Sequence, residues 1–329
     1  MRGERHRLTG PSCLSLVVML AAGALPACGR AERGSGASSR DSSGSPAVGD
    51  PSPRRVITMA PNLTEIVFAL GAGDRLVAVS DFSDFPAAAQ ALPHLGGFVN
   101  PDIEQVLAYK PDLVILRDYS RPLEQKLAAF RVPVLEVRDE AIADIARTMR
   151  EVGRALGLAP RGEALAAALE RELDSYRRRP EPNRRPRVLL VAGRTPGTLQ
   201  NLYAPGAGSF LDEMIRLAGG ANLFADSKVP YLKVSKEEII ARDPEVIVEP
   251  VSASSYGGEK PAAADWRALG TVAAVGSGRV YVLEGDYMLI PGPRLGLALR
   301  DLERVIHAAA EPSPAAAAPE DPPRRRALP

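Results

Sequence analysis

Short apolar runs alternate with amphipathic segments through the middle of the chain. This pattern predicts strands at Val56–Met59, Leu76–Val79, Leu113–Leu116 and Val132–Val137, and again near 187–192, 245–249 and 280–284. It predicts helices near 209–218, 236–242 and 294–309. Because strands and helices alternate, we expect an α/β fold with mainly parallel sheets.

One helix is expected to divide this region into two lobes. Small apolar residues recur at helical spacing from about Pro160 to Arg179, with Glu and Arg between them. We therefore expect an N-terminal α/β lobe over 54–159, a connecting helix over 160–180 and a C-terminal α/β lobe over 181–310. At the start of the first lobe, Asn62 is expected to cap a helix with Glu65 as its acidic third residue, and Gly71 is expected to end it.

A stretch of the first lobe has a counterpart in the second. Residues 103–115 (IEQVLAYKPDLVI) match 236–248 (KEEIIARDPEVIV), 133 residues later. Both predict a capped helix, then a Pro flanked by an acid, then a buried strand. We interpret this as two related lobes; the alternative is chance similarity between short α/β units.

The match places Glu104 and Glu237 at the same point of each lobe. Each is the second residue of its expected helix, where the helix dipole favours a carboxylate, and a good helix start is one explanation. The other is a symmetric pair of exposed acids that docks onto a two-fold partner with basic pockets.

Both ends of the chain differ from this folded region. Residues 1–27 have a basic start and then an apolar run, Leu14–Leu25, which is too short to span a bilayer, and we expect a signal peptide. Leu25-Pro26-Ala27-Cys28 resembles a bacterial lipobox, so Cys28 is expected to carry lipid; ordinary cleavage is the alternative. Residues 28–53 are expected to be a disordered tether and 311–329 a disordered tail.

Composition excludes several classes of function. The 41 Lys and Arg nearly balance the 40 Asp and Glu, giving a net charge of +1, which argues against a nucleic-acid partner. With three His and two Cys, neither a multi-His zinc site nor a disulfide scaffold is expected, and we predict no metal site. The G-x-S-x-G, G-x-x-x-x-G-K-[ST] and H-E-x-x-H motifs are all missing, so an exported enzyme is disfavoured.

Several motifs, in order, resemble substrate-binding proteins of ATP-driven importers for iron chelates and cobalamin. They are Arg55-Val56-Ile57-Thr58 leading to Asn62-Leu63-Thr64-Glu65, Lys110-Pro111-Asp112-Leu113-Val114, Gly208-Ser209-Phe210-Leu211-Asp212-Glu213 and Pro291-Gly292-Pro293-Arg294-Leu295. The resemblance covers about 54–309. It implies a class III periplasmic-binding-protein-like fold, with a ligand cleft between the lobes and small closing motions. It also implies a periplasmic monomer that docks through Glu104 and Glu237 onto a permease dimer with ATPase subunits. The lipid anchor would then sit in the cytoplasmic membrane or the inner leaflet of the outer membrane.

The cobalamin (vitamin B12) branch is the closest match within that family. Residues 80–86 (SDFSDFP) and 228–231 (KVPY) resemble cleft segments of that branch. The resemblance implies that the ligand-binding residues are Phe82, Phe85, Phe98, Tyr231, Asp286 and Tyr287. Phe and Tyr stand where cobalamin proteins often have Trp.

Haem or a ferric siderophore remains the alternative cargo on the same architecture. Siderophores are usually anionic, and Arg117 and Arg194 follow expected strands from which both could reach a cleft. Haem needs an axial Tyr or His, which several tyrosines could supply. Trp266 is expected in the core because it stands in Ala- and Leu-rich sequence.

Overall fold

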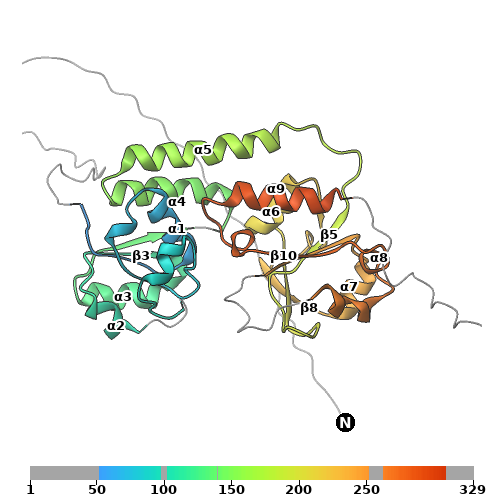
Figure 1. Ribbon diagram of the computed structural model, residues 1–329, viewed down its shortest axis with the longest axis horizontal. Coiled ribbons are helices and arrows are strands. Elements are labelled where there is room, and N and C mark those ends of the chain that lie inside the picture. Colours follow the sequence, from blue (N-terminus) through green and yellow to red (C-terminus); the bar gives the residue numbers. More distant parts are fainter. Residues whose placement is uncertain (1–51, 98–101, 139, 252–261, 309–329) are drawn as a thin grey trace, which may run out of the picture. The chain divides into compact units, whose positions relative to one another are not determined.

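The computed structural model describes residues 52–97, 102–138, 140–251 and 262–308, and the account below concerns these residues. The expected signal peptide, Cys28, most of the tether, Phe98 and the C-terminal tail lie outside the described residues. Figure 1 shows the arrangement of helices and strands.

The first lobe is built on a parallel sheet in the order β2-β1-β3-β4. Its strands are β1 (Val56–Thr58), β2 (Leu76–Val79), β3 (Leu113–Arg117) and β4 (Val134–Val137). Its helices are α1 (Pro61–Ala69), α2 (Ile103–Ala108) and α3 (Arg121–Ala129), with short 3-10 turns at Gly73–Arg75, Ala87–Ala91 and Asp118–Ser120. The four expected strands are confirmed with small shifts at their ends.

The second lobe has a parallel sheet in the order β10-β9-β5-β7. Its strands are β5 (Arg187–Leu190), β7 (Ala221–Asn222), β9 (Val246–Val251) and β10 (Val280–Glu284). The helices are α6 (Phe210–Leu217), α7 (Lys236–Arg242), α8 (Ala273–Gly276) and α9 (Leu295–Ile306), with 3-10 turns at η4 (Ala263–Leu269) and η5 (Asp286–Met288). The expected helices near 209–218, 236–242 and 294–309 are confirmed.

A separate antiparallel pair in the second lobe was not expected from the sequence. It joins β6 (Leu202–Pro205) and β8 (Tyr231–Val234). Leu202 and Ala204 are buried whereas Tyr203 between them is exposed. This two-residue alternation is the mark of a half-buried strand, but it is too short to stand out in a chain rich in Gly and Pro.

A helical hairpin connects the lobes. It consists of α4 (Ile142–Ala155) and α5 (Ala159–Arg177), and α5 continues past α4 to contact α9 of the second lobe (Figure 1). Gly153 and Gly162 let the two helices approach closely, since a Cβ on Gly153 would lie 2.8 Å from the Cα of Gly162. Arg150 of α4 forms ion pairs with Glu163 and Glu170 of α5. The helix expected from about Pro160 to Arg179 corresponds to α5, which begins at Ala159 and ends at Arg177.

The start of α1 corrects one expectation. Its N-cap is Ala60, which provides no side-chain hydrogen bond, and Pro61 occupies the first helical position. Proline fits there because the first turn leaves its N–H groups without helical partners in any case. Asn62 therefore lies inside the helix, and Glu65 is buried within the protein instead of capping the helix. The left-handed Gly71, with a φ of 73°, ends the helix as expected.

The two halves of the sequence repeat adopt the same structure. Arg55 donates from Nη2 to the carbonyl oxygen of Tyr109 at the end of α2, at 2.6 Å. Arg187 donates from Nη2 to the carbonyl oxygen of Asp243 at the end of α7, at 2.7 Å. A cation at a helix C-terminus is favoured by the helix dipole. The helix–strand unit thus occurs once in each lobe with the same capping arginine.

One apolar cluster continues from the first lobe into the second. It includes Ile66 of α1, Met149 of α4, Leu169 of α5, Ile215 of α6 and Leu299 of α9, all 5% exposed or less. Because this cluster passes through the hairpin, moving one lobe far from the other would expose apolar surface.

Candidate ligand-binding site

A pocket of about 360 Å³ lies between the two lobes. The first lobe contributes Arg117, at the end of β3; the second lobe contributes Ala192, Gly193, Tyr203, Phe210, Leu211, Tyr231, Leu289 and Pro291. Arg117 ends one parallel strand, and Ala192 and Gly193 follow β5 closely. Open α/β sheets usually bind ligands at the carboxyl ends of their strands, where this pocket lies.

Two tyrosines on neighbouring strands line this pocket, which we call the tyrosine pocket. Tyr203 of β6 is 42% exposed and Tyr231 of β8 is 44% exposed. They are offset along the antiparallel pair, with Tyr203 opposite Lys233 and Tyr231 opposite Pro205. Tyr231 was named from the sequence as a ligand-binding candidate and Tyr203 was missed. Leu202-Tyr203-Ala204-Pro205 shows no clear alternation of polar and apolar residue types, so the alternation of burial around Tyr203 is visible only in the structure.

Phe82 and Phe85 extend from a loop that buried hydroxyl groups hold in place. The Oγ of Ser83 lies 3.0 Å from Thr64 Oγ1 and 3.2 Å from Ser80 Oγ, so the loop is tied to α1 and to the end of β2. Phe82 adopts a φ of 63°, which is unusual for a bulky residue. The two rings remain 51% and 44% exposed. They are not part of the lining of the tyrosine pocket, so their place in the ligand site stays a prediction.

Arg294, immediately before α9, forms ion pairs with one carboxylate from each lobe. Its Nε donates to Oε2 of Glu65 at 3.0 Å, and its Nη2 donates to the other carboxylate oxygen of Glu65. Its Nη1 donates to Oδ1 of Asp286 at 2.8 Å. Burial raises the pKa of the Glu65 carboxyl, against the opposing effect of Arg294. Burial disfavours the charge on Arg294, but the hydrogen bonds with Glu65 and Asp286 outweigh it and raise its pKa.

Asp286 and Tyr287 are both engaged within the protein. Asp286 binds Arg294, and the hydroxyl of Tyr287 donates to Oδ2 of Asp301 on α9 at 2.6 Å. Burial, followed by this hydrogen bond to a carboxylate, raises the pKa of Tyr287 to about 12. Contact of either residue with a ligand stays a prediction.

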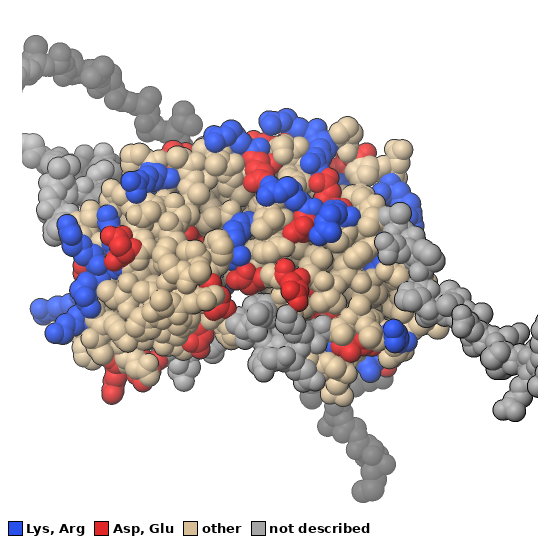
Figure 2. All heavy atoms as spheres, in the orientation of Figure 1, with Lys and Arg blue, Asp and Glu red and all other residues tan. Residues whose placement is uncertain are grey.

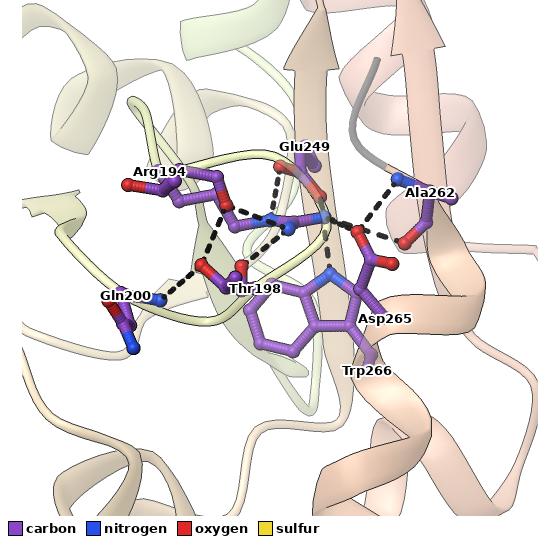
Figure 3. Close-up of polar contacts among 8 residues, drawn as sticks. Arg194, Thr198, Gln200, Glu249, Ala262, Asp265 and Trp266 are labelled. Carbon is purple, nitrogen blue, oxygen red and sulfur yellow. Dashed lines mark hydrogen bonds and ion pairs between the residues drawn. The ribbon is translucent and has the colours of Figure 1, made fainter. Parts of the chain in front are cut away.

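Arg194 does not reach the cleft as the sequence suggested it could. Its side chain is fully buried and lies between Glu249 and Asp265, with Nε–Oε1 and Nη2–Oδ2 distances of 2.7 and 2.8 Å (Figure 3). Burial disfavours its charge, but hydrogen bonds to the two carboxylates outweigh this and raise its pKa. Arg194 therefore links the loop after β5 and η4 to β9, and it does not offer a positive charge to a ligand.

Trp266 completes this buried network. Its Nε1 donates to Oε2 of Glu249 at 3.2 Å, and the side chain is 0% exposed (Figure 3). The expectation that Trp266 belongs to the core is confirmed.

Glu104 and Glu237 occupy equivalent exposed positions. Each is the second residue of its helix, behind the N-caps Asp102 and Ser235, whose side chains accept from backbone N–H groups of the first turn. Within the described ranges, neither carboxylate takes part in a side-chain hydrogen bond or ion pair. Figure 2 shows acidic side chains at the lower edge of the first lobe near α2, and mixed charges along the upper edge near α5 and α9.

None of the helices in the part of the chain that the structure describes is long and apolar enough to cross a membrane. Nor do the described residues contain a group of three or more His, Cys, Asp or Glu side chains placed to bind a metal ion.

The sequence matches one family model and is similar to a protein of known ligand. Residues 56–287 match the family model described as periplasmic binding protein. A vitamin B12-binding protein of Yersinia pestis (strain Pestoides F) is 34% identical over 197 residues, which are 59% of this chain and 68% of that protein.

Two solved structures also align with this chain. The periplasmic heme-binding protein RhuT from Roseiflexus sp. RS-1 aligns with a TM-score of 0.69 and 28% identity, covering 78% of this chain and 99% of that one. The periplasmic vitamin B12 binding protein BtuF of Vibrio cholerae aligns with a TM-score of 0.65 and 28% identity, covering 78% and 97%. The fold is common to all of these proteins, while the ligands in their names differ.

Proposed function

Because the chain belongs to the periplasmic binding protein family, we propose that it captures cobalamin or a related corrinoid and delivers it to an ATP-driven importer. Its relatives are named as vitamin B12-binding and periplasmic heme-binding proteins. The cargo, the docking residues and the membrane anchor are the parts that we propose.

The pocket lined by Tyr203 and Tyr231 is the observation that carries the cargo proposal. Its lining is mostly apolar, and two aromatic side chains from adjacent strands remain partly exposed in it. A corrinoid is a broad ring with apolar faces and amide groups at its edge. Such a ligand is favoured by aromatic surfaces together with a few polar groups. The 34% identity to a vitamin B12-binding protein supports the same cargo.

The charge of the site disfavours an anionic siderophore. Arg194 is enclosed by Glu249 and Asp265, and among the described residues Arg117 is the arginine that lines the pocket. Recognition of several carboxylates or catecholates by charge needs a cluster of cations.

Haem is the second candidate. A tyrosine hydroxyl is a known type of axial ligand for haem iron, and Tyr203 and Tyr231 place two phenol groups at the pocket. The similarity to the heme-binding protein RhuT supports this candidate.

We propose that the protein docks onto its importer through Glu104 and Glu237. The two helix starts present one exposed carboxylate from each lobe at positions related by the internal repeat. A partner with two-fold symmetry and paired basic pockets would bind both at once. We also propose that lipid on Cys28 holds the protein at a membrane surface in the periplasm.

Calorimetry with three ligands tests the cargo. The full chain carrying Cys28→Ser, which prevents acylation at that position, is titrated with cyanocobalamin, haemin and a ferric hydroxamate. We expect cyanocobalamin to bind with a Kd of about 1 μM or tighter, equivalent to about −8 kcal/mol. Binding of haemin with a Soret shift, and no heat from cyanocobalamin at tens of micromolar, would replace the corrinoid with haem.

A further inference from the structure

We propose that Arg294 is a positioning residue that fixes the spacing of the two lobes and holds the pocket-lining segment 286–294 in place. The proposal concerns the ligand-free protein and does not depend on which cargo binds; only its effect on cyanocobalamin affinity rests on the proposed function.

The two carboxylates that Arg294 binds come from different lobes. Glu65 lies in α1 of the first lobe, whereas Asp286 and Arg294 belong to the second. The Glu65 pair therefore crosses from one lobe to the other over 229 positions of sequence, and the Asp286 pair closes the segment upon itself. One guanidinium thus makes a contact between the lobes and a contact within the second lobe.

Burial makes the contact between the lobes costly to break. The side chain of Glu65 is 3% exposed and that of Arg294 is 16% exposed. Removing one partner of a buried ion pair leaves an uncompensated charge, which is strongly destabilising. A shift of the lobes that parted the two groups without admitting water would leave both charges buried and unpaired, so the pair favours a single spacing.

The backbone of the segment also lies against α1. A Cβ on Gly292 would be 3.4 Å from Oε2 of Glu65 and 3.6 Å from Cβ of Asn62. These are ordinary van der Waals distances, so the segment packs directly against the first lobe at this position. Leu289 and Pro291, between Asp286 and Arg294, line the tyrosine pocket. A shift of the segment would change the shape of that pocket.

The same guanidinium supports a candidate cleft aromatic. The Cζ of Arg294 lies 4.1 Å from the centre of the Phe85 ring, in the geometry of a cation–π contact. Phe85 belongs to the first lobe and is 44% exposed. Arg294 therefore orders one aromatic of the first lobe together with the pocket-lining segment of the second.

Distance measurement between spin labels tests the proposal without any ligand. Cys13 and Cys28 are replaced by Ser in the full chain, and labels are attached through Gln125→Cys on α3 and Ala241→Cys on α7, which are both exposed. We expect Arg294→Met to broaden the distribution of distances between the lobes, and Arg294→Lys, which keeps a charge, to restore part of the narrow distribution. The matched control is Arg304→Met, because Arg304 is 67% exposed and pairs with Asp301 of the same helix.

Two further variants separate the contacts of Arg294. Glu65→Gln removes the charge in the first lobe and is expected to broaden the distribution, whereas Asp286→Asn, within the second lobe, is expected to leave it narrow. We expect cyanocobalamin to dissociate about tenfold faster from Arg294→Met. An unchanged distribution in both Arg294→Met and Glu65→Gln would overturn the proposal. If Arg294→Met does not fold, the Glu65→Gln and Arg294→Lys distributions decide the outcome. Failure of cyanocobalamin to bind the unmutated chain would remove the cargo and leave this test intact.

Discussion

Arg194 and Glu249 form a doubly hydrogen-bonded ion pair in which neither side chain is exposed to solvent. Arg194 comes shortly after β5 and Glu249 lies in β9, so the pair joins two neighbouring strands of the second sheet. The contribution of this pair to the free energy of unfolding is measured by removing one partner and then both.

We expect Arg194→Met to lower the free energy of unfolding by about 3–5 kcal/mol, because Glu249 would remain buried without its cation. Urea denaturation followed by tryptophan fluorescence measures the change. The double variant Arg194→Met/Glu249→Leu should recover much of the loss. A double variant less stable than Arg194→Met would contradict the view that the unpaired carboxylate is the cause.

The two pocket tyrosines are expected to contribute to binding. Tyr203→Ala and Tyr231→Ala should each weaken cyanocobalamin binding about tenfold, or about 1.4 kcal/mol, because each removes an aromatic surface from the pocket. Phe130→Ala is the matched control, since Phe130 is 60% exposed and does not line the pocket. Equal affinities for all three variants would show that the ligand binds elsewhere.

Replacement of the two symmetric acids should separate binding from transport. We expect Glu104→Ala/Glu237→Ala to keep its affinity for cyanocobalamin and to abolish cobalamin-dependent growth of cells that rely on this protein, because the docking charges are lost. The control is Asp74→Ala/Glu181→Ala, which removes two other exposed acids. Normal growth with the first double variant would rule out this docking role.

The raised pKa of Tyr287 predicts that the protein loses stability at high pH. Its pKa is raised to about 12, above the value of about 10 in the unfolded chain, so its stabilising effect is complete below pH 10 and is lost as the pH rises through 12. Since Tyr287 is only partly buried, we expect an effect on the order of 1 kcal/mol. Tyr287→Phe should be less stable than the unmutated chain at pH 8, and the difference should shrink by pH 12. A difference that stays constant over this range would contradict the assignment.

Hydrophobic periodicity and the internal repeat determined most of the fold. The expected strands β1 to β5, β9 and β10 and the helix α5 are present, because buried parallel strands and an amphipathic helix depend on local patterns of apolar residues. The equivalent places of Glu104 and Glu237 also follow from the repeat, since a capped helix start depends on a few adjacent residues.

Tertiary structure alone decided the partners of the charged side chains. Glu65 has the sequence features of a helix-capping residue, yet it binds Arg294 from 229 positions away; Arg194 has the features of a cleft cation, yet two carboxylates enclose it. Local sequence does not specify which distant group a side chain will contact. That depends on how the two sheets and the connecting hairpin pack, and the same packing brings Tyr203 and Tyr231 together at the pocket.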